Sequence, residues 1–167
     1  MGARAGISHT GLLHYFPTKA HLLMAVLHHR DEVDRLDLDE DVAQGVSFIE
    51  AMIHLAERNA LRRPMVEAFT VLAAAATTPD HPAHACFRIH YNDAIASATQ
   101  SFRELKAAGT LRPEVDPERE GAQWIALMDG LQTQWLQSLA DYPRAPLDMA
   151  AELRYRLTAM LAAPPTS

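Results

Sequence analysis

Apolar residues recur at intervals of three and four positions along most of the chain, which is the spacing of one face of an α-helix. At least seven helices and no strand are expected, so the predicted fold class is all-α. The longer predicted helices cover about residues 18–30, 45–63, 65–77, 83–108, 118–140 and 147–162.

Proline and acidic residues mark the expected ends of several helices. Thr18 is placed to cap the helix that follows Pro17, and the first part of the acid-rich stretch 31–41 can extend that helix. Residues 37–39 are expected to loosen it. Pro64 is expected to stop the long helix that precedes it.

The composition supports a helical globular chain. Of the 167 residues, 49% are hydrophobic and only 7% are aromatic, which disfavours a β-sandwich or barrel. The single cysteine, Cys86, excludes an internal disulfide. No apolar run is long enough to cross a bilayer and none has the features of a signal peptide, so we expect a cytoplasmic protein with no membrane partner.

Charge is distributed unevenly along the chain. The formal net charge of −6, from 15 basic and 21 acidic residues, by itself disfavours a nucleic-acid partner. Residues 1–30 contain three basic residues, no acidic residue and five of the nine histidines, so residues 31–167 carry a charge of −9. A small neutral-to-positive end on an acidic body is typical of a DNA-reading head attached to a separate folded domain.

The predicted helix over 118–140 has an apolar arc wider than a surface helix needs. We expect it to be buried on two sides and to form, with the helix over 147–162, half of a four-helix interface in a homodimer. A central helix in a monomeric bundle is the alternative. The main stripe consists of Trp124, Leu127, Met128, Leu131, Trp135 and Leu139.

The first 27 residues contain a recognisable motif. Gly6 provides a turn, Ser8 a helix cap, and an aromatic pair stands before Pro17, followed by a hydroxyl-lysine helix start. This pattern resembles the helix-turn-helix signature of the TetR family of bacterial regulators. The resemblance implies a truncated helix-turn-helix DNA-binding domain over 1–30, followed by a helical-bundle regulatory, ligand-binding and dimerisation domain over 31–167.

By this resemblance, the recognition helix would begin near Ser8 and approach base edges in the major groove of operator DNA. The next helix N-terminus would hold a phosphate. Leu13 departs from the family, where tyrosine is common, and Gly11 has no side chain for a base contact. The implied DNA-binding residues are Ser8, His9, Thr10, Gly11, His14, Tyr15, Thr18 and Lys19.

Family members carry a first helix before the point at which this sequence starts. That helix buries the inner face of the head, so a chain of these 167 residues is expected to bind operator DNA poorly. A headless helical module that dimerises or binds small molecules, without binding DNA, is the alternative function.

Glu50, His54 and Arg58 follow one another at steps of four on a predicted helix, which favours a solvated stripe. In the functional alternative they face an internal cavity that takes a small hydrophobic effector. The candidate effector pocket comprises His54, Arg58, Phe69, Phe87, Tyr91, Trp124 and Met128.

Enzymatic chemistry is the least supported class. Cys86, His90 and Asp93 share a helix face at the spacing of metal ligands or of a thiol–imidazole pair, but nothing completes such a site, so neither a metal nor a cofactor is expected. Hydrolase, metalloprotease and phosphate-loop motifs are missing from the sequence. The favoured function is a DNA-binding transcriptional repressor whose operator binding is controlled by a small-molecule effector.

Overall fold

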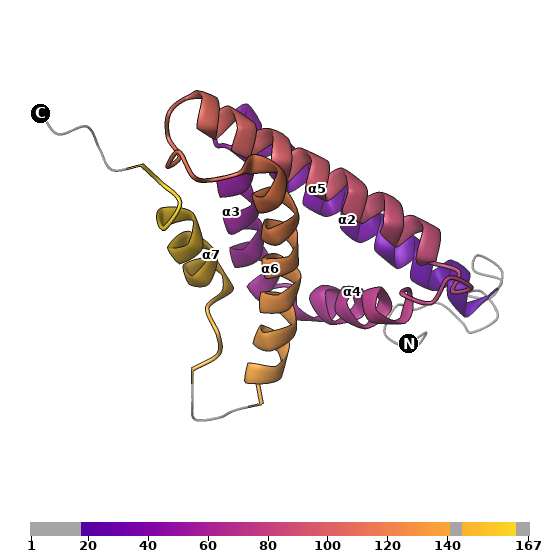
Figure 1. Ribbon diagram of the computed structural model, residues 1–167. Helices are drawn as coiled ribbons and strands as arrows, with labels where there is room; N and C mark the ends of the chain where they lie inside the picture. The colour runs from indigo at the N-terminus through magenta and orange to yellow at the C-terminus, as the bar shows by residue number, and fades with distance from the viewer. Residues whose placement is uncertain (1–17, 141–144, 163–167) are drawn as a thin grey trace, which may run out of the picture.

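The computed structural model describes residues 18–140 and 145–162, which form an all-helical structure (Figure 1). The predicted all-α fold is confirmed. Within these ranges the one pairing of extended backbone is an isolated bridge between Leu111 and Leu161. The helices are α2 (Lys19–Ala43), α3 (Phe48–Ala60), α4 (Arg63–Ala75), α5 (His84–Ala107), α6 (Pro117–Ser138) and α7 (Met149–Thr158).

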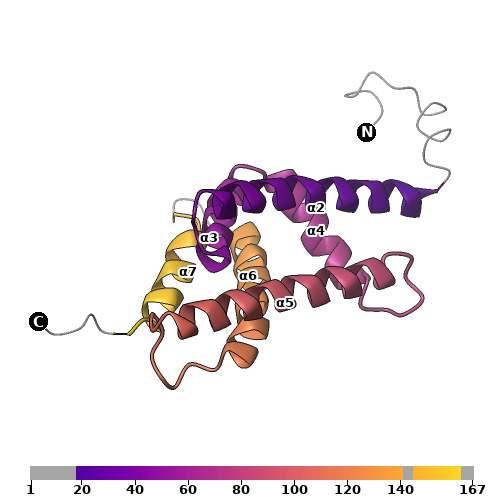
Figure 2. The same cartoon turned by 90° about the horizontal axis from the view of Figure 1, so that it is seen from above.

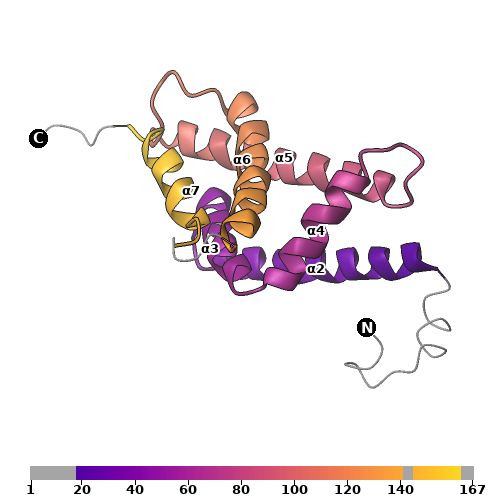
Figure 3. The same ribbon diagram turned by 90° about the horizontal axis from the view of Figure 1, so that it is seen from below.

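The two longest helices, α2 and α5, run along opposite sides of the molecule when it is seen from above (Figure 2). α4 crosses between them at one end, and α3, α6 and α7 pack together toward the other (Figure 3). The first residue of α2, Lys19, lies at the end remote from α7. None of the described helices is both long and apolar enough to cross a membrane.

Two groups of buried apolar side chains hold the helices together. The larger group lies among α3, α5, α6 and α7, and two of its members, Phe102 and Trp124, meet edge to face with ring centroids 5.8 Å apart. The smaller group joins α2 and α4 to the start of α5 and includes Leu27, Phe69 and Phe87. α2 is therefore anchored to the rest of the molecule by few apolar contacts.

α5 and α6 approach each other closely at Gly121. A Cβ atom at this position would lie 2.0 Å from Oγ1 of Thr99 and 2.9 Å from its Cα atom, closer than any two such atoms can pack. Gly121 therefore allows the backbones of the two helices to touch.

Three expected helix boundaries were wrong. α2 continues through residues 37–39 to Ala43, because Asp37 is ion-paired with Arg58 and Arg62. α3 ends at Ala60, and Pro64 lies in the first turn of α4, where its missing N–H leaves no helical bond unmade. α7 stops at Thr158, and residues 110–112 and 160–162 then pair through backbone hydrogen bonds. The predicted domain boundary at residue 30 lies within α2 and stays a prediction.

Candidate ligand cavity

A cavity of about 480 Å³ lies among α2, α3, α5 and α6. Its volume is within the range that accommodates small organic molecules. α2 and α5, which run on opposite sides in Figure 2, supply facing walls, and α3 and α6 supply the remainder. Much of the surface is apolar, with contributions from Leu27, Phe48, Met52, Leu55, Ile125 and Met128.

The polar part of the lining is rich in carboxylates. Five aspartates face two arginines, so the lining carries a formal charge of −3 when its two histidines are neutral. The acidic, basic and histidine residues of the lining are His28, Arg30, Asp31, Asp34, Arg35, Asp39, His90, Asp93 and Asp129.

Arg30 organises the α2 wall of the cavity. Its Nε atom lies 2.7 Å from Oδ2 of Asp34, one helical turn along, and its Nη1 atom lies 3.1 Å from Oδ1 of Asp31. The guanidinium carbon also lies 3.9 Å from the ring centroid of Phe69, in a cation–π arrangement. Burial raises the pKa of Asp34 above its ordinary value, and the opposing effects of Arg30 and Arg62 do not offset it.

Asp31 lies between Arg30 and the α5 wall. Burial alone would raise the pKa of Asp31, but the hydrogen bond from His90 and the nearby charge of Arg30 outweigh it, so the pKa falls below its ordinary value. The Nδ1 atom of His90 lies 3.4 Å from Oδ1 of Asp31. This contact connects α2 to α5 across the cavity.

Asp129 and Gln132 form the polar part of the α6 wall. The hydroxyl of Tyr91, which does not itself line the cavity, donates a hydrogen bond of 2.6 Å to Oδ2 of Asp129. Burial raises the pKa of Asp129, against the smaller lowering effect of this hydrogen bond. Gln132, one turn further along α6, is only 1% exposed, and its amide forms no hydrogen bond within residues 18–140 and 145–162.

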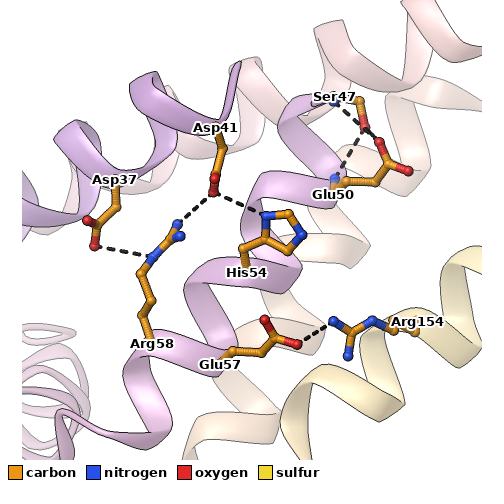
Figure 4. A network of polar contacts seen from close by, with 8 residues as sticks. All are labelled: Asp37, Asp41, Ser47, Glu50, His54, Glu57, Arg58 and Arg154. Carbon is orange, nitrogen blue, oxygen red and sulfur yellow. Dashed lines mark hydrogen bonds and ion pairs between the residues drawn. The ribbon is translucent and has the colours of Figure 1, made fainter. Parts of the chain in front are cut away.

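A ladder of ion pairs fastens the second half of α2 to α3 (Figure 4). Arg58 lies between two carboxylates, with Nε 3.3 Å from Oδ2 of Asp37 and Nη2 2.8 Å from Oδ2 of Asp41. His54 adds a contact of 3.4 Å to Asp41, and Arg62 lies 2.7 Å from Asp37. The hydrogen bond from Arg58 is the main reason that the pKa of Asp41 lies below its ordinary value.

α3 is also fixed at its start and on its other side. Ser47 and Glu50 form a reciprocal capping box, in which each side chain accepts a hydrogen bond from the backbone N–H of the other residue. Glu57 pairs with Arg154 of α7 (Figure 4). α3 therefore provides a fixed support against which α2 is held.

The seven residues predicted for the effector pocket do not gather in one cavity. Met128 lines the cavity described here. Phe69, Phe87 and Tyr91 are not part of this lining, and the rings of Phe69 and Tyr91 each contact those of Phe87 and His90. The remaining three lie elsewhere, since Trp124 packs in the main core and His54 and Arg58 belong to the ion-pair ladder.

The other predicted site residues have mixed placements. Lys19 begins α2 and Thr18 is exposed just before it, whereas Ser8, His9, Thr10, Gly11, His14 and Tyr15 lie outside the described residues. Cys86, His90 and Asp93 all line the cavity. In the described part of the chain no cluster of three histidine, cysteine or acidic residues has the geometry to hold a metal ion.

Comparison with known proteins identifies the family. Residues 43–163 match the profile of the C-terminal domain of BetI-type transcriptional repressors. No curated protein matches the chain. The crystal structure of a protein from Rhodococcus sp., described as a TetR-family transcriptional regulator, superimposes with a TM-score of 0.68 at 19% sequence identity, covering 96% of this chain and 85% of that one. The structural likeness shows a shared fold, and because the profile spans well over half of the sequence, the chain belongs to the TetR family of transcriptional regulators.

Proposed function

We propose that the chain is a transcriptional repressor whose affinity for operator DNA is controlled by a small molecule in the cavity. One observation carries the proposal. α2 supplies a wall of the cavity through Arg30, Asp31 and Asp34, and the same helix begins at Lys19, directly after the motif that resembles a helix-turn-helix.

The continuity of α2 provides a physical link between the two regions. Its 25 residues form one uninterrupted helix, which corresponds to a rod roughly 37 Å long. The ion-pair ladder holds this rod against α3 near its C-terminal end, at Asp37 and Asp41, whereas its middle, from Leu27 to Asp39, borders the cavity. A ligand that changes the spacing between α2 and α5 would therefore tilt the DNA-binding end of α2. Two heads have to lie about 34–36 Å apart to enter successive major grooves, so a small tilt would change DNA affinity.

Lys19→Ala is expected to weaken DNA binding about tenfold and to reduce the salt dependence of binding by about one phosphate contact. The physical reason is loss of one ammonium group at a helix N-terminus proposed to hold a DNA phosphate. The measurement is a series of mobility-shift titrations at several salt concentrations, with duplexes selected by the protein from a random pool.

The matched control for this experiment is Arg88→Ala, because Arg88 is exposed on α5 and carries the same charge. Equal losses in both variants would show a general effect of net charge and would contradict a specific role of Lys19.

We also propose that α6 and α7 form the interface of a homodimer. The outward face of α6 carries the small residues Ala122 and Ala126, both exposed, and a Cβ atom built on Gly130 would meet open space. Tyr155 on α7 is 77% exposed. Small residues on one helix face allow a second helix to approach closely, and an exposed aromatic side chain supplies apolar area to bury.

Ala126→Arg is expected to convert the dimer to a monomer, raising the dissociation constant by about a hundredfold or more, because a long charged side chain would be buried without a partner. Sedimentation velocity over a range of protein concentrations measures this change. Ala96→Arg is the control, since Ala96 is exposed in the middle of α5. A dimer that tolerates Ala126→Arg but not Ala96→Arg would place the interface on α5.

A further inference from the structure

The α6 wall of the cavity presents hydrogen-bond acceptors that no described protein group satisfies. Tyr91 donates to Oδ2 of Asp129, and within the described residues Oδ1 receives no hydrogen bond. Gln132 lies one turn away and lines the same cavity with its amide unpaired, although the residue is only 1% exposed. Buried polar groups in folded proteins are almost always paired, so the unpaired amide of Gln132, beside the free oxygen of the partly exposed Asp129, indicates a missing partner that donates hydrogen bonds.

The opposite wall does not supply the missing positive charge. The guanidinium of Arg30 is already shared between Asp31 and Asp34 and stacked on Phe69. Together with Asp129, these groups place three carboxylates against one guanidinium around the cavity. Arg30 and His90 only partly offset the charge of Asp129, since its pKa remains raised by burial. An anionic ligand would meet net repulsion here, whereas a cation would complement the lining.

Asp129 is expected to lower the stability of the protein when no ligand is bound. The residue is partly buried, and the hydration that its carboxylate loses is only partly replaced by the hydrogen bond from Tyr91 and the charges of Arg30 and His90. An alanine or leucine at this position of α6 would extend the apolar stripe at no such cost. Ionisable groups kept in a cavity against their own stability are typical of binding sites.

We propose that the cavity binds a protonated organic amine with an apolar body. The ammonium N–H groups donate to Oδ1 of Asp129 and to the amide oxygen of Gln132, and the body lies against apolar residues such as Met52, Ile125 and Met128. The inference deepens the proposed function, because it names the chemical class of the molecule that would control DNA binding.

Four probes that share one apolar body and differ only in the head group test the proposal. They are 4-(1-naphthyl)butylamine, its N,N,N-trimethyl derivative, 4-(1-naphthyl)butanol and 5-(1-naphthyl)pentanoate, each titrated into the protein by isothermal calorimetry at pH 7. The amine is expected to bind at least about tenfold more tightly than the alcohol. The trimethylammonium probe, which has charge but no N–H donor, is expected to lie between them, and the carboxylate is expected not to bind.

The Asp129→Asn variant tests whether the ammonium group of the ligand binds at Asp129. Asparagine has nearly the same shape and can still accept the Tyr91 hydrogen bond, so the fold is retained, and a thermal melt checks this. Affinity for the amine is expected to fall about tenfold, while affinity for the alcohol changes less than twofold. Asp80→Asn is the control, because Asp80 is exposed in the loop between α4 and α5 and does not line the cavity.

Several outcomes would overturn the proposal. They are binding of the carboxylate or alcohol as tightly as the amine, an unchanged amine affinity in Asp129→Asn, and failure of all four probes to bind. The proposed function is tested separately by adding the amine to the protein–DNA complex. If the amine binds in an Asp129-dependent way but leaves DNA affinity unchanged, the ligand class stands and control of DNA binding by this cavity fails.

Discussion

Gly121→Ala is expected to lower the free energy of unfolding by about 3 kcal/mol, although only one methyl group is added. Thr99 of α5 occupies the position that the new Cβ atom needs, with its Oγ1 atom 2.0 Å away and its backbone N and Cα atoms both 2.9 Å away. The hydroxyl can rotate, but the two backbone atoms move only if α5 and α6 separate. Separation would loosen the main core around Phe102 and Trp124.

Urea denaturation followed by circular dichroism measures this loss. Gly130→Ala is the matched control, because it makes the same substitution on the same helix where a Cβ atom meets nothing within 4 Å. Alanine is a better helix former than glycine, so the control is expected to be neutral or up to about 1 kcal/mol more stable. A Gly121→Ala variant as stable as the Gly130→Ala variant would show that the two helices can move apart at little cost.

The helices were predictable where local signals are strong. Gly109, a residue with positive φ, follows the end of α5, and Pro117 lies in the first turn of α6, so both boundaries fall within a few residues of the expected ones. The end of α2 was harder to predict, because the residues that stabilise the helix at Asp37 belong to other parts of the chain. Ion pairs with Arg58 and Arg62 stabilise that turn, and local sequence does not reveal which basic residues will face it.

Two local signals were present and could have been used. Ser47 and Glu50 have the spacing of a capping box and mark the start of α3 directly. Asp34, Asp37 and Asp41 are spaced three and four apart, which places three carboxylates on one face of a helix. Such a face predicts a basic partner, and the arginines of α3 and its following turn supply it.

The cavity was less predictable than the fold, because helical spacing identifies the residues that share a face but not what that face meets. Aromatic residues such as Trp124 and Phe87 have the same spacing whether they fill a core or line a pocket, and here they fill cores. The clue to the cavity that the sequence did contain was a pair of polar residues. Asp129 and Gln132 interrupt an otherwise apolar arc of α6, and a polar pair within a buried arc needs partners that a core does not offer.

Arg30→Met is expected to lower the free energy of unfolding by about 3–5 kcal/mol. The side chains of Arg30 and Asp34 are only 9% and 7% exposed, so removing the guanidinium leaves a buried carboxylate without its closest counter-charge. Stacking on Phe69 is lost as well. Arg35→Met is the matched control, because Arg35 pairs with Asp39 on the same helix at the same spacing but with side chains 63% and 64% exposed. An exposed pair of this kind contributes about 0.5 kcal/mol or less.

Measuring the free energy of unfolding of Arg30→Met at several pH values separates the effect of lost charge pairing from that of lost packing. Burial already raises the pKa of Asp34 in the folded state, and removing Arg30 takes away an influence that lowers it. A group whose folded pKa lies above its unfolded value stabilises the protein below the unfolded pKa, and that contribution is lost as the pH rises through the folded pKa. The defect in Arg30→Met is therefore expected to be larger at pH 8 than at pH 5.

The double variant Arg30→Met with Asp34→Leu tests whether the unpaired carboxylate of Asp34 causes the loss of stability. Because it removes both members of the buried pair, it is expected to recover most of the lost stability, to within about 1 kcal/mol of the original protein, and to lose the added pH dependence. Urea titrations at both pH values provide all the free energies for the cycle. A double variant as unstable as Arg30→Met would mean that the other contacts of Arg30, with Asp31 and with the ring of Phe69, contribute more stability than its ion pair with Asp34.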